Sequence, residues 1–148
     1  MAFTHLLVPT DGSEASARAV QQATDLAQRL GCRLTLLHVR ENVPLSLVGM
    51  GEMVEPTTIE ALLQAARELS EGILAEARTL VQAAGVQVDT ESVNDDGVHV
   101  AILEAAHRHG CDLIVMGSHG RRGLVNLLLG SETQRVLVQS SCPVLVVR

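Results

Sequence analysis

The chain has 148 residues, a formal net charge of −6 and a sequence pI near 5.4. This length suits one domain with a sizeable core, so we expect a single domain over residues 1–148. The negative charge, with no basic stripe to offset it, argues against nucleic acid and membrane surfaces as partners. All 11 basic residues are arginines, which excludes a lysine Schiff base and the lysine-containing phosphate loop.

The composition favours a layered α/β fold in a reducing compartment. Apolar residues make up 47% of the chain, yet Phe3 is its sole aromatic residue, so the core must consist of Val, Leu, Ile and Ala. No stretch approaches the roughly 18 apolar residues of a membrane span, and no basic, apolar leader opens the chain. Cys32, Cys111 and Cys142 are odd in number and lack C-x-x-C spacing, which argues against disulfides. We therefore expect a cytoplasmic protein with reduced thiols.

The first part of the chain predicts two strands separated by a helix. A strand over residues 6–9 ends in the turn 10–13, and apolar residues then recur on one helix face up to Gly31, which ends the helix. A second strand is predicted over residues 34–39. The following segment, 41–58, is unusually apolar for so long a connection. It is a lid or a partner surface, or else a linker with some residues packed onto the core.

The rest of the chain continues the alternation of helix and strand. Its predicted elements are a long helix over 59–84, a strand over 86–93, a helix over 98–109, a strand over 113–116, a helix over 131–139 and a strand over 143–147. Strands joined by helical crossovers lie parallel, with right-handed connections and helices on both faces. The expected fold class is therefore α/β, a doubly wound sheet of five parallel strands.

A glycine-rich loop follows the predicted strand over 113–116. It contains Gly117 and Gly120 and, after nine further residues, Gly130 and Ser131 at the start of a predicted helix. Glycines here allow close approach of a ligand and positive φ, and the helix start presents free N–H groups and a hydroxyl. Glycines after a strand also simply form turns. Three of them together with the hydroxyl favour an anion site.

Asp11 follows the first predicted strand directly. In parallel sheets, ligands bind beyond the carboxyl ends of the strands, where the strand order reverses. If strands two and three lie on one side of strand one, and strands four and five on the other, Asp11 and the glycine loop flank the same crevice. Asp11 would then bind a ribose hydroxyl, an adenine amine or a phosphate-bound Mg²⁺. Alternatively, Asp11 only caps the helix that begins near Ser13.

Four segments together resemble the universal stress protein family in its small single-domain form, over essentially the whole chain. They are LLVPTDGS at 6–13, LLHV at 36–39, the ATP-binding pattern G-x2-G-x9-G-[ST] at 117–131, and SCPVLVVR at 141–148. The resemblance implies the strand order 3-2-1-4-5 with about four helices, a fold like that of the adenine nucleotide alpha hydrolases. It also implies an adenine near Asp11 and the Val39 backbone, and a ribose near Pro9, Thr10 and Gly117. The phosphates would lie along Gly120, Gly130 and Ser131, with a hydroxyl from Thr133.

One residue departs from the family pattern. Glu132 stands immediately after Gly130-Ser131, where the family more often has an apolar or hydroxyl residue. A carboxylate there repels a nearby phosphate unless it points outward or meets a metal. Arg121 and Arg122 in the loop could compensate, or remain solvated surface residues, and His119 could stack on or hydrogen-bond a nucleotide or stay exposed.

We therefore predict an ATP-binding or AMP/ADP-binding stress-response module whose nucleotide state modulates dimer or partner interactions. The residues Glu104, His107, His109 and Cys111 superficially suggest a metal site, but their spacing is poor for metal ligands. We therefore expect Mg²⁺ to bind only together with the nucleotide. The alternatives are a slow ATPase, which lacks a recognisable catalytic base, and a nucleotide-independent partner protein. The apolar strand Val144, Leu145, Val146, Val147 would be an edge that pairs with its copy in a homodimer. The candidate nucleotide-binding residues are Pro9, Thr10, Asp11, Val39, Met116, Gly117, His119, Gly120, Arg121, Gly130, Ser131, Glu132 and Thr133.

Overall fold

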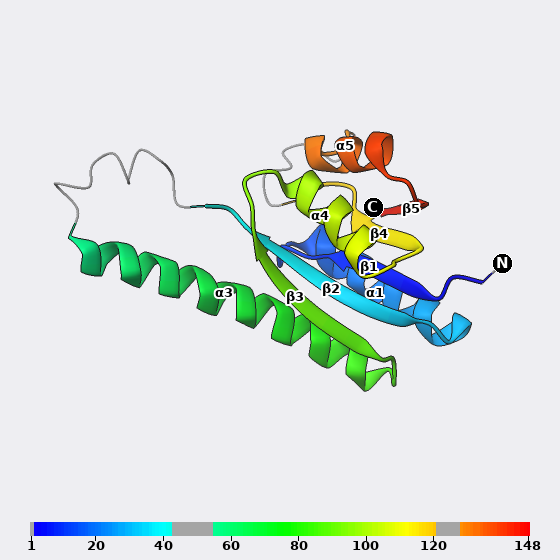
Figure 1. The fold of residues 1–148 in the computed structure, drawn as a ribbon. Helices are drawn as coiled ribbons and strands as arrows, with labels where there is room; N and C mark the ends of the chain where they lie inside the picture. Colours follow the sequence, from blue (N-terminus) through cyan, green and yellow to red (C-terminus); the bar gives the residue numbers. More distant parts are fainter. Residues whose placement is uncertain (1, 43–54, 121–127) are drawn as a thin grey trace.

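A computed structural model describes residues 2–42, 55–120 and 128–148 and contains a sheet of five parallel strands in the order β3-β2-β1-β4-β5 (Figure 1). This confirms the predicted fold class and places the reversal of strand order between β1 and β4. The elements are β1 (His5–Pro9), α1 (Glu14–Leu30), β2 (Arg33–Arg40), α3 (Pro56–Ala83), β3 (Val88–Asn94), α4 (Val98–Arg108), β4 (Leu113–Gly117), α5 (Ser131–Gln139) and β5 (Val144–Val147).

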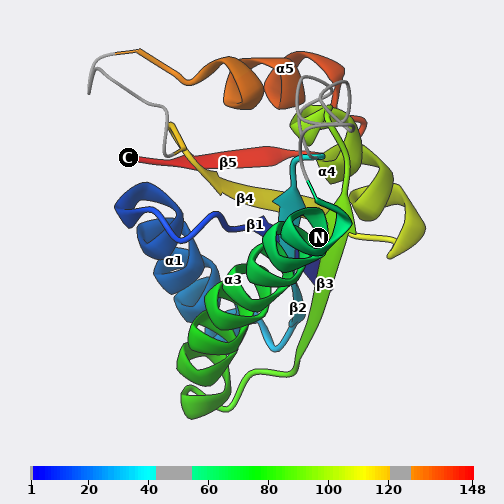
Figure 2. The same cartoon turned by 90° about the vertical axis from the view of Figure 1, so that its left-hand side faces the viewer.

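Helices cover both faces of the sheet. Figure 2 shows α1 and α3 on one face and α4 and α5 on the other. Because side chains alternate along a strand, β1 contributes Leu6 and Val8 to the core under α1 and α3, and Leu7 to the core under α4 and α5. The central strands β1 and β4 are buried on both faces and are continuous apolar runs, which is why the sequence pattern located them.

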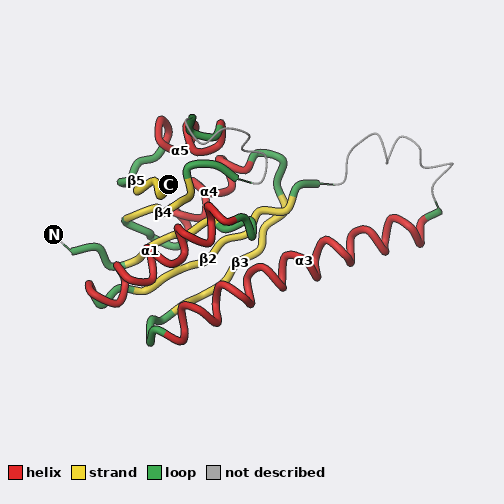
Figure 3. Tube along the Cα trace, turned by 180° about the vertical axis from the view of Figure 1, so that it is seen from behind, coloured by secondary structure: helices red, strands yellow, loops and turns green. Residues whose placement is uncertain are grey.

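The long helix differs from its prediction at its start. It begins at Pro56 instead of residue 59, with the proline in the first turn, where its missing N–H has no helical partner to lose. Its buried residues are Ser70, Leu74 and Val81, so no residue before Ser70 is buried in α3. Figure 3 shows this first part of α3 running past the ends of the strands. Residues 43–54 of the predicted lid or linker lie outside the described residues.

A chain of hydroxyl and imidazole groups fixes the second half of α3 to the sheet. The Ser70 hydroxyl lies 2.7 Å from His38 Nδ1 on β2 and 2.7 Å from the Ser92 hydroxyl on β3. Because Ser70 is buried, these bonds satisfy a polar group that would otherwise be costly to bury. Within the part of the chain described, no helix is long and apolar enough to cross a bilayer.

Candidate functional site

The turn between β1 and α1 is held by its own polar groups. Ser13 is the N-cap of α1, and its side chain accepts a hydrogen bond from the Ser16 amide at 3.2 Å. Asp11 Oδ1 accepts from the Ser13 amide at 2.9 Å, and Gly12 has a φ of 78°, which favours glycine. Asp11 therefore supports the turn before the cap and is not the cap itself.

The loop after β4 comes against this turn at Gly120. A Cβ placed on Gly120 would lie 2.7 Å from Asp11 Oδ2, so the carboxylate occupies the space that a side chain would need. Asp11 also makes interactions with further groups of the chain. The predicted convergence of the two loops at the reversal between β1 and β4 is therefore present in the fold.

The motif glycines are required for close packing. A Cβ on Gly117 would lie 2.9 Å from the Ala15 carbonyl carbon in α1, and one on Gly130 would lie 3.2 Å from His119 Cα. Gly117, Gly120 and Gly130 all lack a positive φ. The expectation that positive φ explains these glycines is therefore wrong, because Gly117 and Gly130 lie against backbone atoms and Gly120 lies against the Asp11 carboxylate, which leaves no room for a side chain.

The start of α5 is anchored to the end of β4. The Gly130 amide donates to the Ser118 carbonyl at 2.7 Å, and the Thr133 hydroxyl donates to the Gly117 carbonyl at 3.0 Å. Thr133 is buried, whereas Ser131 is exposed at the first position of the helix. The N-cap of α5, Gly130, supplies no side-chain hydrogen bond, so the first amides of the helix are suited to an anion.

Val39, in β2, lies at the same end of the sheet. The Leu37 carbonyl accepts a hydrogen bond from Thr10 on the β1 side, whereas the Arg40 carbonyl accepts one from the residue after β3. Backbone groups alternate in direction along a strand, so the N–H and C=O of Val39 face the β1 side. The register of β1 with β2 ends at Pro9 opposite Leu37, and Val39 lies beyond it. Val39 thus presents one donor and one acceptor on the β1 side, beyond the last residue that pairs with β1.

Glu132 is turned toward α4. Its Oε2 accepts hydrogen bonds from the His99 amide at 2.7 Å and is 2.9 Å from His99 Nδ1, while Oε1 accepts from Arg135 at 2.7 Å. Burial alone would raise the pKa of Glu132, but the bonds from His99 and the nearby positive charges hold it below the usual value. The carboxylate therefore caps the start of α4. No sequence signal pointed to His99, because 33 positions separate the two residues.

The remaining predicted residues occupy different surroundings. Met116 is buried in the core under α4 and α5, so only its backbone can face a ligand. His119 is partly exposed, with Nδ1 3.1 Å from the Ser118 hydroxyl. Arg121 and Arg122 lie outside the described residues. Ser118, which the sequence did not single out, also donates its amide to the Val147 carbonyl of β5 at 2.8 Å.

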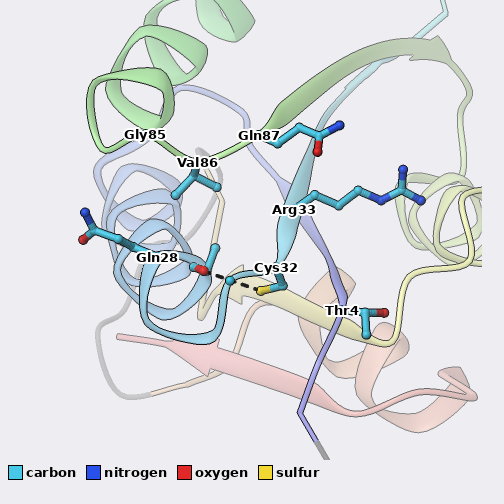
Figure 4. Close-up of a pocket in the computed structure, with 9 residues that line it drawn as sticks. Thr4, Gln28, Cys32, Arg33, Gly85, Val86 and Gln87 are labelled. Atoms are coloured by element: carbon cyan, nitrogen blue, oxygen red, sulfur yellow. Dashed lines mark hydrogen bonds between the residues drawn. The ribbon is translucent and has the colours of Figure 1, made fainter.

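A pocket of about 400 Å³ lies at the opposite end of the sheet (Figure 4). None of the predicted site residues lines it. The ends of α1 and α3 meet there, the Gln28 side chain donates to the Ala84 carbonyl at 3.1 Å, and the Cys32 thiol lies 4.0 Å from the Ala27 carbonyl. In the ranges described, no group of three or more His, Cys, Asp or Glu residues is arranged to hold a metal.

Three comparisons with known proteins agree with this geometry. The model of the universal stress protein family matches residues 2–148. The chain is 38% identical to the universal stress protein YxiE of Bacillus subtilis, over 99% of both chains. Its structure is similar to UspA from Lactobacillus plantarum, with a TM-score of 0.83 and 26% identity over 100% of this chain and 99% of that one. It is also similar to a universal stress protein crystallised in complex with cAMP, with a TM-score of 0.69 and 28% identity over 100% and 98% of the two chains.

Proposed function

Because the chain belongs to the universal stress protein family, we propose that it binds an adenine nucleotide, ATP with Mg²⁺, and acts as a stress-response binding module. The observation that carries this proposal is the convergence of the Asp11 turn and the Gly117–Gly120 loop where the strand order reverses. The relative that was crystallised with cAMP supports an adenine nucleotide as the ligand class.

Each part of the site has a task in this proposal. The Val39 backbone would pair with the adenine edge, and Pro9, Thr10 and the Gly117 backbone would line the ribose. The uncapped amides at the start of α5 and the Ser131 hydroxyl would hold phosphate, since a helix N-terminus favours anions. Asp11 supplies oxygen atoms of the kind that Mg²⁺ prefers. The glycines bring these backbone groups close to one another.

The site is joined directly to the edge strand β5. Ser118 lies in the glycine loop, and its amide bonds to Val147 at the end of β5. β5 pairs with β4 on one side only, and Leu145 is 41% exposed. We therefore extend the proposal to a homodimer formed by pairing of β5 with its copy, whose geometry responds to the nucleotide through this bond.

The state of the cysteines fits the cytoplasmic location that we propose. Cys32, Cys111 and Cys142 are all free thiols. Burial raises the pKa of the Cys111 thiol to about 12, so the thiol stays protonated and unreactive at neutral pH. Disulfides are rare in reducing compartments, so free thiols fit the proposed location.

The test combines detection of bound nucleotide with a loop variant. Native mass spectrometry of the protein purified without added ligand should show ATP, ADP or AMP bound. Gly120→Val places a branched side chain between the two loops. Its Cβ would lie 2.7 Å from Asp11 Oδ2 and against no backbone atom of the described residues, so the variant should fold but bind ATP at least about tenfold more weakly by calorimetry. Gly72→Val, at an open position on α3, is the matched control and should bind like the wild type.

Two results would contradict the proposal. If the folded Gly120→Val protein binds ATP as tightly as the wild type, the nucleotide site lies elsewhere. If the wild type binds no adenine nucleotide at all, with or without Mg²⁺, the chain is a nucleotide-independent member of its family.

A further inference from the structure

Glu132 places a negative charge at the very start of α5. It is the second residue of the helix, two positions after Gly130, and it is held there by three contacts of 2.7–2.9 Å to His99 and Arg135. Its side chain is 34% exposed, so it is neither freely solvated nor fully screened by protein. The carboxylate cannot swing away from this region without leaving the α4 amide unpaired.

Two carboxylates lie, among the described residues, beside the glycine loop and at the start of α5. Asp11 lies beside Gly120, and Glu132 is the second residue of α5, two positions after Gly130. Arg135 pairs with Glu132, but its side chain is 54% exposed, and solvent weakens the compensation. Glu132 also interacts with the positive N-terminal end of the α5 dipole, with which a bound phosphate would otherwise interact alone.

The cost of this charge depends on the ligand. Coulomb repulsion is proportional to the charge on the ligand, so the repulsion is greatest for metal-free ATP and smallest for AMP or cyclic AMP. A bound Mg²⁺ offsets part of the phosphate charge and reduces the repulsion. The same carboxylate would therefore weaken binding more for nucleotides that carry more uncompensated phosphate charges.

We propose that Glu132 is a specificity-determining residue, through which the site accepts adenine nucleotides with few uncompensated charges, namely AMP, cyclic AMP or Mg²⁺-bound ATP, and disfavours metal-free ATP. This inference rests on the proposed adenine-nucleotide site. It assigns to Glu132 a role in selecting among nucleotides that is separate from its role in capping α4.

The capping role and the charge can be separated by mutation. In Glu132→Gln the amide oxygen can still accept from the His99 amide, so the start of α4 stays satisfied while the charge is removed. Arg135→Gln changes the local charge in the opposite direction at an exposed position. Glu76→Gln, on the exposed side of the second half of α3, makes the same change in net charge away from α5 and is the matched control.

The experiment is calorimetric titration of these proteins with ATP and AMP, in EDTA and in excess Mg²⁺. Glu132→Gln should strengthen binding of metal-free ATP by about tenfold and of AMP, which carries about half the charge, by about threefold. Arg135→Gln should weaken metal-free ATP more than AMP, and Glu76→Gln should change neither. Mg²⁺, or an increase in ionic strength, should reduce the effect on ATP, since both screen the charge.

The failure of this inference can be told apart from the failure of the proposed function. If the wild type binds nucleotide but Glu132→Gln changes ATP and AMP affinity by the same factor, or changes neither, Glu132 does not determine specificity. A stronger effect on AMP than on metal-free ATP would overturn it as well. If no protein in the series binds any adenine nucleotide, the proposed function itself is wrong, and this inference falls with it.

Discussion

At the N-terminal end of the sheet the buried polar groups bond to one another, whereas at the C-terminal end several backbone groups lie beyond the last paired residue. His5, which is 3% exposed, lies with Nε2 2.7 Å from the Thr35 hydroxyl and with Nδ1 3.1 Å from the His109 carbonyl. Asp112 accepts hydrogen bonds from the Thr4 amide and hydroxyl and from the His5 amide. These bonds tie together β1, β2 and the end of α4.

Ion pairs extend this network to β3. Glu91 is 2.6 Å from His109 Nε2 and accepts from Arg108 at 2.5 Å. Burial would raise the pKa of Glu91, but the bonds from His109 and Arg108 outweigh it and hold the pKa below the usual value. At the other end of the sheet, the Val39 backbone lies beyond the last residue that pairs with β1, and the first amides of α5 have no side-chain cap. Under the proposed function, one end of the sheet serves mainly stability, and the other keeps hydrogen-bonding groups for a ligand.

The largest expected effect is at Gly117, which packs against α1 and also belongs to the proposed nucleotide site. It tests whether stability and ligand binding are separated between the two ends of the sheet. A Cβ at Gly117 would lie 2.9 Å from the carbonyl carbon and 3.0 Å from the carbonyl oxygen of Ala15, which cannot move without displacing α1. We expect Gly117→Val to lower the free energy of unfolding by about 3 kcal/mol or more, measured by urea denaturation without ligand. Gly72→Val should stay within about 1 kcal/mol of the wild type. Equal stability of the two variants would show that the Gly117 loop is not tightly packed on α1.

The next effect sharpens the role of the N-terminal end and depends on pH. Burial, and then the charge of Arg33, hold the pKa of His5 below its ordinary value of 6.5. Between pH 6.5 and the folded pKa, the unfolded chain therefore binds a proton at His5 that the folded protein does not bind. The contribution of neutral His5 to stability is fully present above pH 6.5 and is lost as the pH falls from there through the folded pKa. His5→Leu removes this step and, by leaving the Thr35 hydroxyl and the His109 carbonyl without the ring, should cost about 2 kcal/mol at pH 7.5.

Urea denaturation between pH 7.5 and 5 measures both parts of this prediction. This range lies above the ordinary pKa of 4.5 at which the paired carboxylates Glu91 and Glu132 would begin to contribute. As the matched control, His107→Gln removes an exposed histidine of α4 instead of the buried one. If the pH dependence of the free energy of unfolding is unchanged in His5→Leu, a group other than His5 binds fewer protons in the folded state than in the unfolded chain.

The smallest effect concerns the edge strand that adjoins the proposed site. The carbonyls of Pro143 and Val147 accept from β4 and the loop after it, so the alternate residues turn their backbone groups to the open edge, and the Val146 N–H faces outward. Val146→Pro removes that donor without touching the β4 ladder and should weaken the proposed dimer by about tenfold or more. Leu145→Asp adds charge at an exposed position of the same edge and should act likewise.

Light scattering at micromolar concentration gives the mass. The wild type should measure about twice the single-chain 15.7 kDa, and both variants should move toward 15.7 kDa. Leu80→Asp, on α3 near the opposite edge of the sheet, should leave the mass unchanged. A wild-type mass of one chain would refute the dimer, and a dimer that tolerates both changes in β5 would place the interface elsewhere.

Local pattern was enough to predict most of the fold. Apolar runs such as Leu6 to Val8 mark strands buried on both faces, and the one-sided periodicity before Gly31 marks α1, because side-chain spacing is a local property of the backbone. The glycine loop and Asp11 were predicted at the carboxyl ends of β4 and β1 for the same reason. The start of β3 was predicted two residues early because Val86, although apolar, donates its amide to Val81 in the turn that ends α3.

The sequence by itself thus determined the order and type of the elements and the end of the sheet where the candidate site lies. Only the tertiary structure decided that Gly117 is needed against α1, that Val39 presents its backbone beyond β1, and that Glu132 turns to His99. These three facts depend on the distance and direction between segments far apart in the chain. Packing of whole layers sets such distances, and no periodicity within a single helix or strand encodes them.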